Sequence, residues 1–308
     1  MEKKNRVYGI IGIRSNMSNW NADFTGRPKS TSKGEIFGSD KALKHPMKVK
    51  WEINGEKVLY IKSFKEDKGK ISPRTLSERY EHIFGEKVSK DNNIAIKNLF
   101  NCIDVMNFGA TFAEGGSNFS ITGAVQIGQG FNIYNDTRVE VQDILSPFRN
   151  SKDEDARNSS LGTKITVDEA HYCYPFTVNP NSYKNYAEII DGFEGYTVEA
   201  YEKFKEASKT SVTEFATNSK FGCDNEYSIF VELKESSNMT LPMLTYYVDF
   251  KKDNGECELD ITRLMNFLAD VDDVESIVIN YNPELVKLIN TSGHKEHIRQ
   301  HILTGKEV

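Results

Sequence analysis

Residues 9–51 constrain the fold of this chain most, because they place a long irregular loop between a short strand and a capped helix. The strand covers residues 7–14, where apolar side chains alternate. Ser39 and Asp40 open a lysine-bearing helix over residues 39–50. A loop of this length without periodicity is uncommon inside a compact domain and is usually functional or disordered. Because this loop is held at both ends and is rich in amides and cations, its composition favours binding over disorder.

The charge of the chain is unevenly distributed. The net charge is −6, but residues 1–74 hold 17 Lys and Arg against 8 Asp and Glu, a balance of +9. Residues 75–308 hold 22 against 37, a balance of −15. Such asymmetry indicates a polyanion-binding face on an acidic body, with an unevenly charged solvated surface as the alternative. Because the cations share a stretch with the unusual loop, the first interpretation is favoured.

Composition is that of a globular protein without a membrane span. Hydrophobic residues make up 38% and charged residues 27% of the chain, and no apolar run approaches the roughly 18–20 residues that a span requires. Residues 1–13 have a basic head, but their apolar run is too short for a signal peptide and predicts a strand. The cysteines are far apart and form no CxxC pair, which argues against a disulfide framework or a metal ribbon. The expected location is the cytoplasm.

Hydrophobic periodicity predicts an α+β fold with a ferredoxin-like core. The predicted order is β-α-β-β-α-β, the arrangement of RNA-recognition modules. The predicted core elements are strands at 7–14, 118–133, 169–179 and 227–235 and helices at 39–50 and 197–218. In the second of these strands one face is apolar, whereas the other carries short polar side chains that include Thr122 and Gln126. The glycines of residues 109–130 are expected to let another backbone approach closely.

Further elements are predicted around this core. Residues 146–168 are polar and predict either a loop or an arm that becomes ordered on a partner. Asn54 and Gly55 indicate a turn within a hairpin or loop pair at 52–70. The remaining predictions are helices from Ser72 to Gly85, from Asn93 to Gly109 and over 259–269 with Asp260 as its cap, strands at 244–250 and 276–281, and a short polar helix at 294–303.

Common catalytic signatures do not occur in the sequence. No phosphate-binding GxxxxGK[ST] loop and no GxSxG elbow is present. His297 and His301 have HxxxH spacing but lack the glutamate of a zinc protease, so a polar terminal helix is the preferred interpretation. We therefore expect a protein that is not an enzyme, with no cofactor, no metal and no catalytic residues.

What remains is chemistry suited to binding a nucleic acid. Lysine and arginine neutralise phosphates, and asparagine and serine fix the register on the backbone without reading sequence. The predicted RNA-binding residues are Arg14, Asn16, Asn19, Asn21, Arg27, Lys29, Ser39, Lys41, Lys44, Lys48, Thr122 and Gln126. Trp20, Phe24 and Phe37 are candidates for stacking on bases, although packing inside the loop is slightly favoured for Trp20. Ser39 and Asp40 are expected first of all to cap the helix.

Two groups of motifs resemble a known family. The first comprises the Asn-rich loop that begins at Ser15, the run Gly26-Arg27-Pro28-Lys29 and the helix start Gly38-Ser39-Asp40 with Lys44-His45. The second is NFGATFA at 107–113 followed by ITGAVQI at 121–127. Together they resemble the Cas-seven superfamily, the backbone subunit of type I CRISPR surveillance complexes (Cascade), and most closely its type I-B branch. The family has a Lys-Arg pair where this chain has Lys44-His45, and Pro46 is expected to kink or end the helix.

The resemblance implies a hand-shaped subunit. Its RRM-like palm would comprise residues 1–51, 107–145 and 184–308, with a fingers insertion at 52–106 and a thumb insertion at 146–183. Copies would stack head-to-tail along a CRISPR RNA, together with other Cascade subunits, and present the guide for pairing with target DNA in antiviral defence. No membrane partner is expected.

Two other functions stay open at this point. Type III backbone relatives cut target RNA with an aspartate in the loop after the first strand, and Asp23 is the candidate for such a metal-dependent endonuclease. A lone loop carboxylate more often caps a turn. A free-standing regulator or generic RNA binder is the third interpretation, and it predicts monomers on RNA instead of regular arrays.

Overall fold

A central mixed sheet organises the computed structural model, which describes residues 1–145, 161–293 and 297–308. Its strands are β1 (Val7–Ser18), β2 (Phe37–Gly38), β7 (Val125–Ile127), β8 (Gly130–Asn132), β9 (Val139–Leu145), β10 (Leu161–Val178), β11 (Cys223–Leu233), β14 (Val274–Tyr281) and β16 (Ile298–His301). They lie in the order β16-β14-β11-β1-β10-β8-β2, and β7 and β9 also pair with β10. The predicted mixture of helices and strands around a central sheet is confirmed. In that sheet β11, β1 and β10 lie side by side, with β7 and β8 next to β10. The ferredoxin-like order of the core stays a prediction.

Strand β1 lies in the middle because its side chains are apolar on both faces. It pairs antiparallel with β10 on one side and β11 on the other, so that Ile11 is opposite both Tyr174 and Ser228. Gly9 is required here, since a Cβ atom at this position would lie 2.3 Å from the ring of Phe176. The sheet can therefore hold large aromatic residues directly over its central strand.

Each face of the sheet has its own core. Helices α1 (Asp40–Ile53) and α6 (Val198–Glu214) cover one face, where Trp51, Phe204 and Phe230 are buried. Helix α7 (Thr262–Ala269) packs on the other face against Ile229 and Val231. Consecutive residues of β11 thus enter opposite cores, as the two-residue period of a strand requires. A small sheet of β12 (Asp249–Asp253), β13 (Glu256–Asp260) and β15 (Val286–Ile289) and the 3-10 helix η2 (Leu244–Tyr247) complete the second side.

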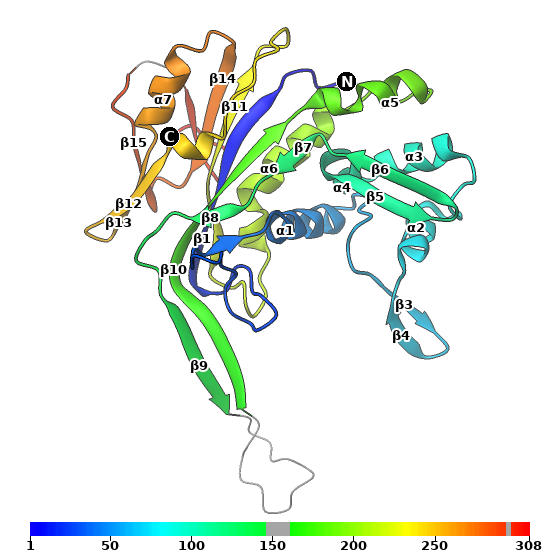
Figure 1. The fold of residues 1–308 in the computed structure, drawn as a ribbon, viewed down its shortest axis with the longest axis horizontal. Helices are drawn as coiled ribbons and strands as arrows, with labels where there is room; N and C mark the ends of the chain where they lie inside the picture. The colour runs from blue at the N-terminus through cyan, green and yellow to red at the C-terminus, as the bar shows by residue number, and fades with distance from the viewer. Residues whose placement is uncertain (146–160, 294–296) are drawn as a thin grey trace, which may run out of the picture.

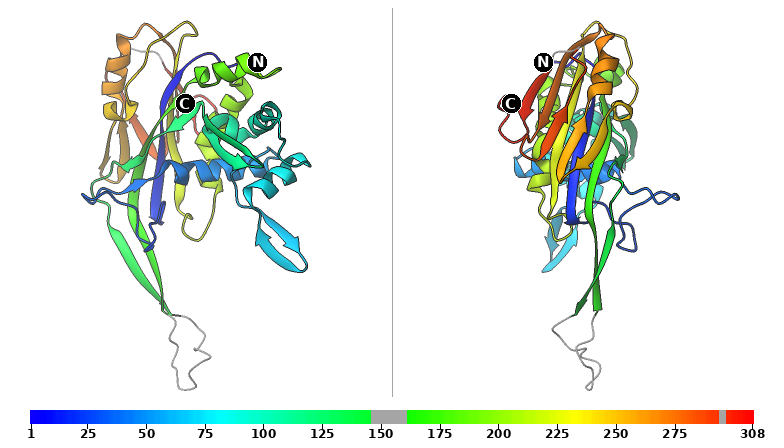
Figure 2. Two further views of the ribbon diagram at one scale, coloured as in Figure 1. Left: turned by 45° about the vertical axis from the view of Figure 1, so that its right-hand side comes forward. Right: turned by 90° about the vertical axis from the view of Figure 1, so that its left-hand side faces the viewer.

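Two hairpins project from the same end of the molecule (Figures 1 and 2). One is an arm in which β9 pairs with the first part of β10. The other pairs β3 (Phe64–Asp67) with β4 (Lys70–Pro73). The latter belongs to a region that also contains α2 (Leu76–Phe84), α3 (Asn92–Phe100), α4 (Ile103–Phe108), β5 (Gly109–Glu114) and β6 (Ser117–Thr122). In Figure 1, α1 lies between the bases of the two projections.

The structure corrects the predicted strand at 118–133. Residues 117–122 form β6, which pairs with β5 in a separate two-stranded sheet, whereas β7 and β8 join the central sheet. The chain changes sheet at Gly123, where a Cβ atom would lie 2.2 Å from the carbonyl carbon of Phe108. A glycine at this crossing lets one backbone pass directly over another, which agrees with the close approach expected from the glycine content.

Several helix and strand boundaries also differ from the predictions. Helix α1 continues past Pro46 to Ile53, and Asn54 is its C-cap instead of part of a hairpin turn. The helix predicted from Asn93 is broken into α3 and α4, and Ser72 and Pro73 belong to β4. Residues 244–247 form the 3-10 helix η2 rather than a strand, and α7 begins at Thr262.

The predicted C-terminal polar helix is wrong over the residues that the structure describes. His294 lies outside them, and Ile298–His301 form strand β16, parallel to β14. The predicted arm or loop falls largely outside them as well, because residues 146–160 are not described. The arm starts before residue 146, with β9, and ends in β10, while the palm, fingers and thumb boundaries stay a prediction. No helix in the described part of the chain is long and apolar enough to cross a membrane.

Candidate nucleic-acid interface

Helix α1 begins at a well-defined cap. The Ser39 side chain accepts a hydrogen bond from the Ala42 backbone N–H at 3.3 Å. The Asn21 side-chain oxygen accepts one from the Ser39 backbone N–H at 2.9 Å. Asn21 therefore ties the long loop to the start of the helix, and Ser39 acts first as a cap, as expected from the sequence.

The lysines of α1 line an open groove of about 630 Å³. Lys41, Lys44 and Lys48 follow a spacing of three to four residues, which places them on one side of the helix. The groove is lined by Asp40, Lys41, Lys44, His45 and Lys48 of α1 and, outside this helix, by Tyr60, residues 108–111 and Ile121. Pro46 is buried against the core, so the helix presents its cations without interruption.

The positive charge of this groove is only partly neutralised. Lys44 pairs with Asp40 at 3.0 Å and lies 5.2 Å from the centre of the Phe108 ring. Lys48 donates a hydrogen bond to the Tyr60 carbonyl at 3.3 Å, and burial lowers the pKa of its ammonium. Lys41 is exposed. A groove with several cations and one carboxylate attracts a polyanion.

His45, the residue that departs from the Lys-Arg pair of the motif resemblance, lines the same groove. Its ring packs edge-on against Phe215, with 5.1 Å between ring centres. Burial lowers the pKa of His45, and the neighbouring cations Lys48 and Lys220 lower it further. The imidazole is therefore largely neutral at pH 7 in the free protein, and a phosphate beside it would favour the charged form.

The opposite wall of the groove is built by a tight crossing of two strands. Gly109 has φ = 75°, and a Cβ atom there would lie 2.1 Å from the Ile121 carbonyl oxygen. The Asp104 carboxylate accepts hydrogen bonds from the backbone N–H groups of Leu59 and Tyr60, both at 2.8 Å. These hydrogen bonds fix the wall that faces the lysines. The sequence analysis missed Tyr60 and residues 108–111 as site residues, although the glycine of the matching NFGATFA motif marks this crossing.

The structure excludes direct contact by two of the loop residues. Asn19 is 4% exposed and its amide donates to the carbonyls of Gly26 at 2.9 Å and Ile165 at 3.1 Å, so it ties the loop to β10. Trp20 is 0% exposed and donates to the Tyr174 hydroxyl at 2.6 Å. Trp20 therefore packs inside the protein, which is the interpretation that the sequence slightly favoured, and its ring is not available to stack on a base.

The tip of the loop is exposed and lies outside the groove lining. Arg27 is exposed and Lys29 is half-buried. Asp23 accepts hydrogen bonds from the Thr25 backbone and hydroxyl and from the Arg27 backbone, at 2.7 to 3.1 Å. The hydrogen bonds from Thr25 hold the pKa of the Asp23 carboxyl below its usual range. Asp23 thus caps a turn, which is the structural role expected of a lone loop aspartate.

The other predicted residues are divided between different hollows. Arg14 and Asn16 line a second hollow of about 740 Å³ with Lys164 and Asn218, at the base of the arm. Thr122 is exposed directly after the groove residue Ile121. Gln126 lines a third, mostly apolar hollow beside Leu241. The structure therefore brings together Lys41, Lys44 and Lys48, but places Arg14, Asn16 and Gln126 elsewhere.

Of the aromatic candidates, Phe24 and Phe37 keep some exposed surface. Phe24 is fully exposed at the loop tip. Phe37 is half-buried, and its ring lies 5.9 Å from that of Phe131, which is itself exposed. Both remain compatible with stacking on a base.

Taken together, the fold and the groove define a class: an α/β protein with projecting hairpins and a cation-lined groove suited to a nucleic-acid backbone. The family of CRISPR-associated protein Cas7 matches residues 5–272. The chain belongs to this family.

Solved structures agree with this assignment at the level of the fold. One chain of a "CRISPR RNA-guided surveillance complex, pre-nicking" is similar with a TM-score of 0.56 and 12% identity, over 93% of this chain and 96% of that chain. A chain of another "CRISPR RNA-guided surveillance complex" has a TM-score of 0.50 and 15% identity, with 94% of each chain covered. No curated protein matches the sequence.

Proposed function

We propose that this protein is a backbone subunit of a CRISPR RNA-guided surveillance complex and that it binds the guide RNA along the α1 groove. The observation that carries the proposal is the groove itself, in which Lys41, Lys44 and Lys48 face the tight crossing at Gly109. Cations on a rigid helix neutralise phosphates whatever the base sequence, and sequence recognition can then belong to the guide. Membership of the Cas7 family and the fold similarity support this function.

The finer features of this function follow from the motif resemblance. We infer a type I complex of the I-B kind, in which copies stack head-to-tail along the CRISPR RNA beside other Cascade subunits. The guide would then be presented for pairing with target DNA in antiviral defence. We place the protein in the cytoplasm and assign it no catalytic step of its own. The turn-capping role of Asp23 gives no support to an endonuclease.

The proposal is tested by the salt dependence of RNA binding. We expect the double variant Lys41→Gln/Lys44→Gln to bind single-stranded RNA more weakly and to lower the slope of log affinity against log salt by about 0.7 for each phosphate that is no longer neutralised. The matched control is Lys251→Gln/Lys287→Gln, which removes two exposed cations of the β12-β13-β15 sheet that pair with Glu258. Fluorescence anisotropy over a range of salt concentrations measures both.

The same experiment can refute the assignment of the groove. An unchanged slope in the groove variant, or an equal decrease in the control variant, would show that the RNA lies elsewhere or is held by charge in general. Circular dichroism of both variants confirms that the fold is retained.

A further inference from the structure

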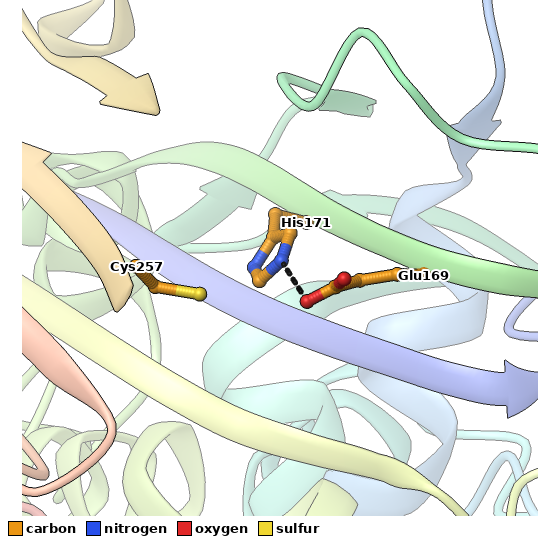
Figure 3. A group of neighbouring side chains, drawn as sticks. All are labelled: Glu169, His171 and Cys257. Carbon is orange, nitrogen blue, oxygen red and sulfur yellow. Dashed lines mark hydrogen bonds and ion pairs between the residues drawn. The ribbon is translucent and has the colours of Figure 1, made fainter. Parts of the chain in front are cut away.

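A group of metal-ligating side chains lies on the opposite side of the sheet from the α1 groove. Glu169 and His171 are two residues apart on β10 and therefore point to the same face. Cys257 comes from β13 in the small sheet. One donor atom from each residue lies within 4.8 Å of the others. Figure 3 shows the Cys257 sulfur and the Glu169 carboxylate pointing toward the His171 ring.

The three side chains differ in chemistry but share a protected environment. His171 is 1% exposed and Cys257 is 5% exposed. The His171 ring lies 4.1 Å from the ring of Phe250 and is approached edge-on by Tyr134. A thiolate, an imidazole and a carboxylate surrounded by aromatic residues form a donor set that zinc accepts in proteins.

A second carboxylate orients the imidazole. Both carboxylate oxygens of Glu226 lie 2.9 Å from Nδ1 of His171. A histidine that binds a metal commonly donates its other ring N–H to a carboxylate, which fixes its orientation and its tautomer. With Nδ1 held by Glu226, Nε2 is the ring nitrogen that faces the other donors, and it lies in hydrogen-bond contact with Glu169 Oε1 at 3.3 Å.

The cluster also has an open side. Glu169 and Cys257 line a hollow of about 570 Å³, together with Lys252 and Lys287. Lys252 pairs with the other Glu169 oxygen at 2.6 Å. With a divalent ion bound, the Cys257 thiolate, the Glu169 and Glu226 carboxylates and the Lys252 ammonium would leave the cluster neutral. The hollow gives an ion a path of entry and leaves room for a water as fourth ligand.

We propose that Glu169, His171 and Cys257 bind one zinc ion, with Glu226 as the residue that positions His171. Zinc ligated by sulfur, nitrogen and oxygen needs donor atoms about 3.3–3.8 Å apart. The donors therefore close by about 1 Å through side-chain rotation when the ion binds. The ion would cross-link the β12-β13-β15 sheet to β10, the strand that continues into the projecting arm.

Cobalt substitution in the whole chain tests this site. Cobalt(II) replaces zinc and gives an intense charge-transfer absorption only when a thiolate is bound to it. After removal of metals with a chelator, we expect cobalt chloride to produce this absorption at about one equivalent per chain, and zinc to abolish it. Cys257→Ser should remove the absorption, and Glu226→Gln should weaken zinc binding about 10–100-fold while retaining it.

Two variants serve as matched controls. Cys223→Ser removes a different buried cysteine, which hydrogen-bonds to Ser18 and is not one of the three proposed metal ligands. Glu258→Gln changes the carboxylate next to Cys257, which pairs with Lys251 and Lys287. Both should keep the absorption. The proposal is overturned if the wild-type chain shows no thiolate absorption with excess cobalt, since the four side chains and Lys252 would then form only a charge network. It is equally overturned if the absorption survives in Cys257→Ser.

Discussion

His45 shows how a single residue can make RNA binding depend on pH. Burial and the cations Lys48 and Lys220 hold its pKa below the ordinary 6.5 in the free protein. A bound phosphate favours the imidazolium, so binding takes up a proton and strengthens as the pH falls toward 6. Because the free imidazole is already partly charged near pH 6, we expect the affinity to rise several-fold, but by less than about 10-fold, between pH 8 and 6.

The prediction for His45 is checked by anisotropy titrations of three proteins at several pH values. His45→Gln should bind with little dependence on pH, at the affinity that the wild type has at pH 8. His45→Arg, which restores the charge of the family pattern, should bind tightly at every pH. A wild-type pH dependence that persists in His45→Gln would assign the titrating group to another residue.

At this scale, sequence predicted the residues whose role depends on their neighbours in the chain. Ser39 caps its helix because its hydroxyl reaches an N–H three residues away. The burial of Trp20 depends instead on Tyr174, 154 positions further on. No local pattern distinguishes a loop tryptophan that packs inward from one that offers its ring to a base.

Between elements, the Asp104 carboxylate fixes the wall of the groove. It lies in α4 but accepts hydrogen bonds from Leu59 and Tyr60, and burial raises its pKa. Asp104→Ala should leave both N–H groups without a partner and reduce the free energy of unfolding by about 2–4 kcal/mol. Asp104→Asn should cost less, because the amide oxygen still accepts from one of the two N–H groups, although its NH2 group faces the other. Urea unfolding measures both, with the exposed Asp253→Asn as control; equal midpoints in Asp104→Ala and the control would contradict the role of Asp104.

Elements with a strong hydrophobic periodicity could be predicted from the sequence, whereas strands that exist only because they pair with another strand could not. The apolar side chains of β1 and α6 reveal the type of each element, because burial imposes a period of 2 or 3.6. Strand β16 has four residues and no apolar stripe, and it exists because β14 offers a free edge. Similarly, the alternation over residues 118–133 predicted one strand, but Gly123 lets the chain change from one sheet to another.

At the scale of the whole molecule, the candidate site was also only partly predictable from the sequence. The sequence predicted that cations near the amino end form one cradle, and Lys41, Lys44 and Lys48 do line one groove. Arg14 and Asn16 do not line this groove, because successive side chains of β1 point to opposite faces of the sheet and these two point away from α1. A hollow at the base of the arm thus remains a second, separate candidate for contact with RNA.

The arm is the part of the molecule best suited to contact another copy. All residues of β9 are exposed, and Val141, Ile144 and Leu145 present apolar side chains to solvent on a projecting hairpin. Exposed apolar surface of this kind marks an interaction site.

If copies stack along RNA as proposed, Val141→Ser/Ile144→Ser should abolish regular arrays in negative-stain electron micrographs. The melting temperature should hardly change, because surface substitutions alter stability by less than about 0.5 kcal/mol. Affinity for an RNA long enough for one copy should also stay the same, whereas cooperative binding to a longer RNA should disappear. Regular arrays in the variant would show that the arm does not join the copies, and monomers on RNA in the wild type would favour a generic RNA binder.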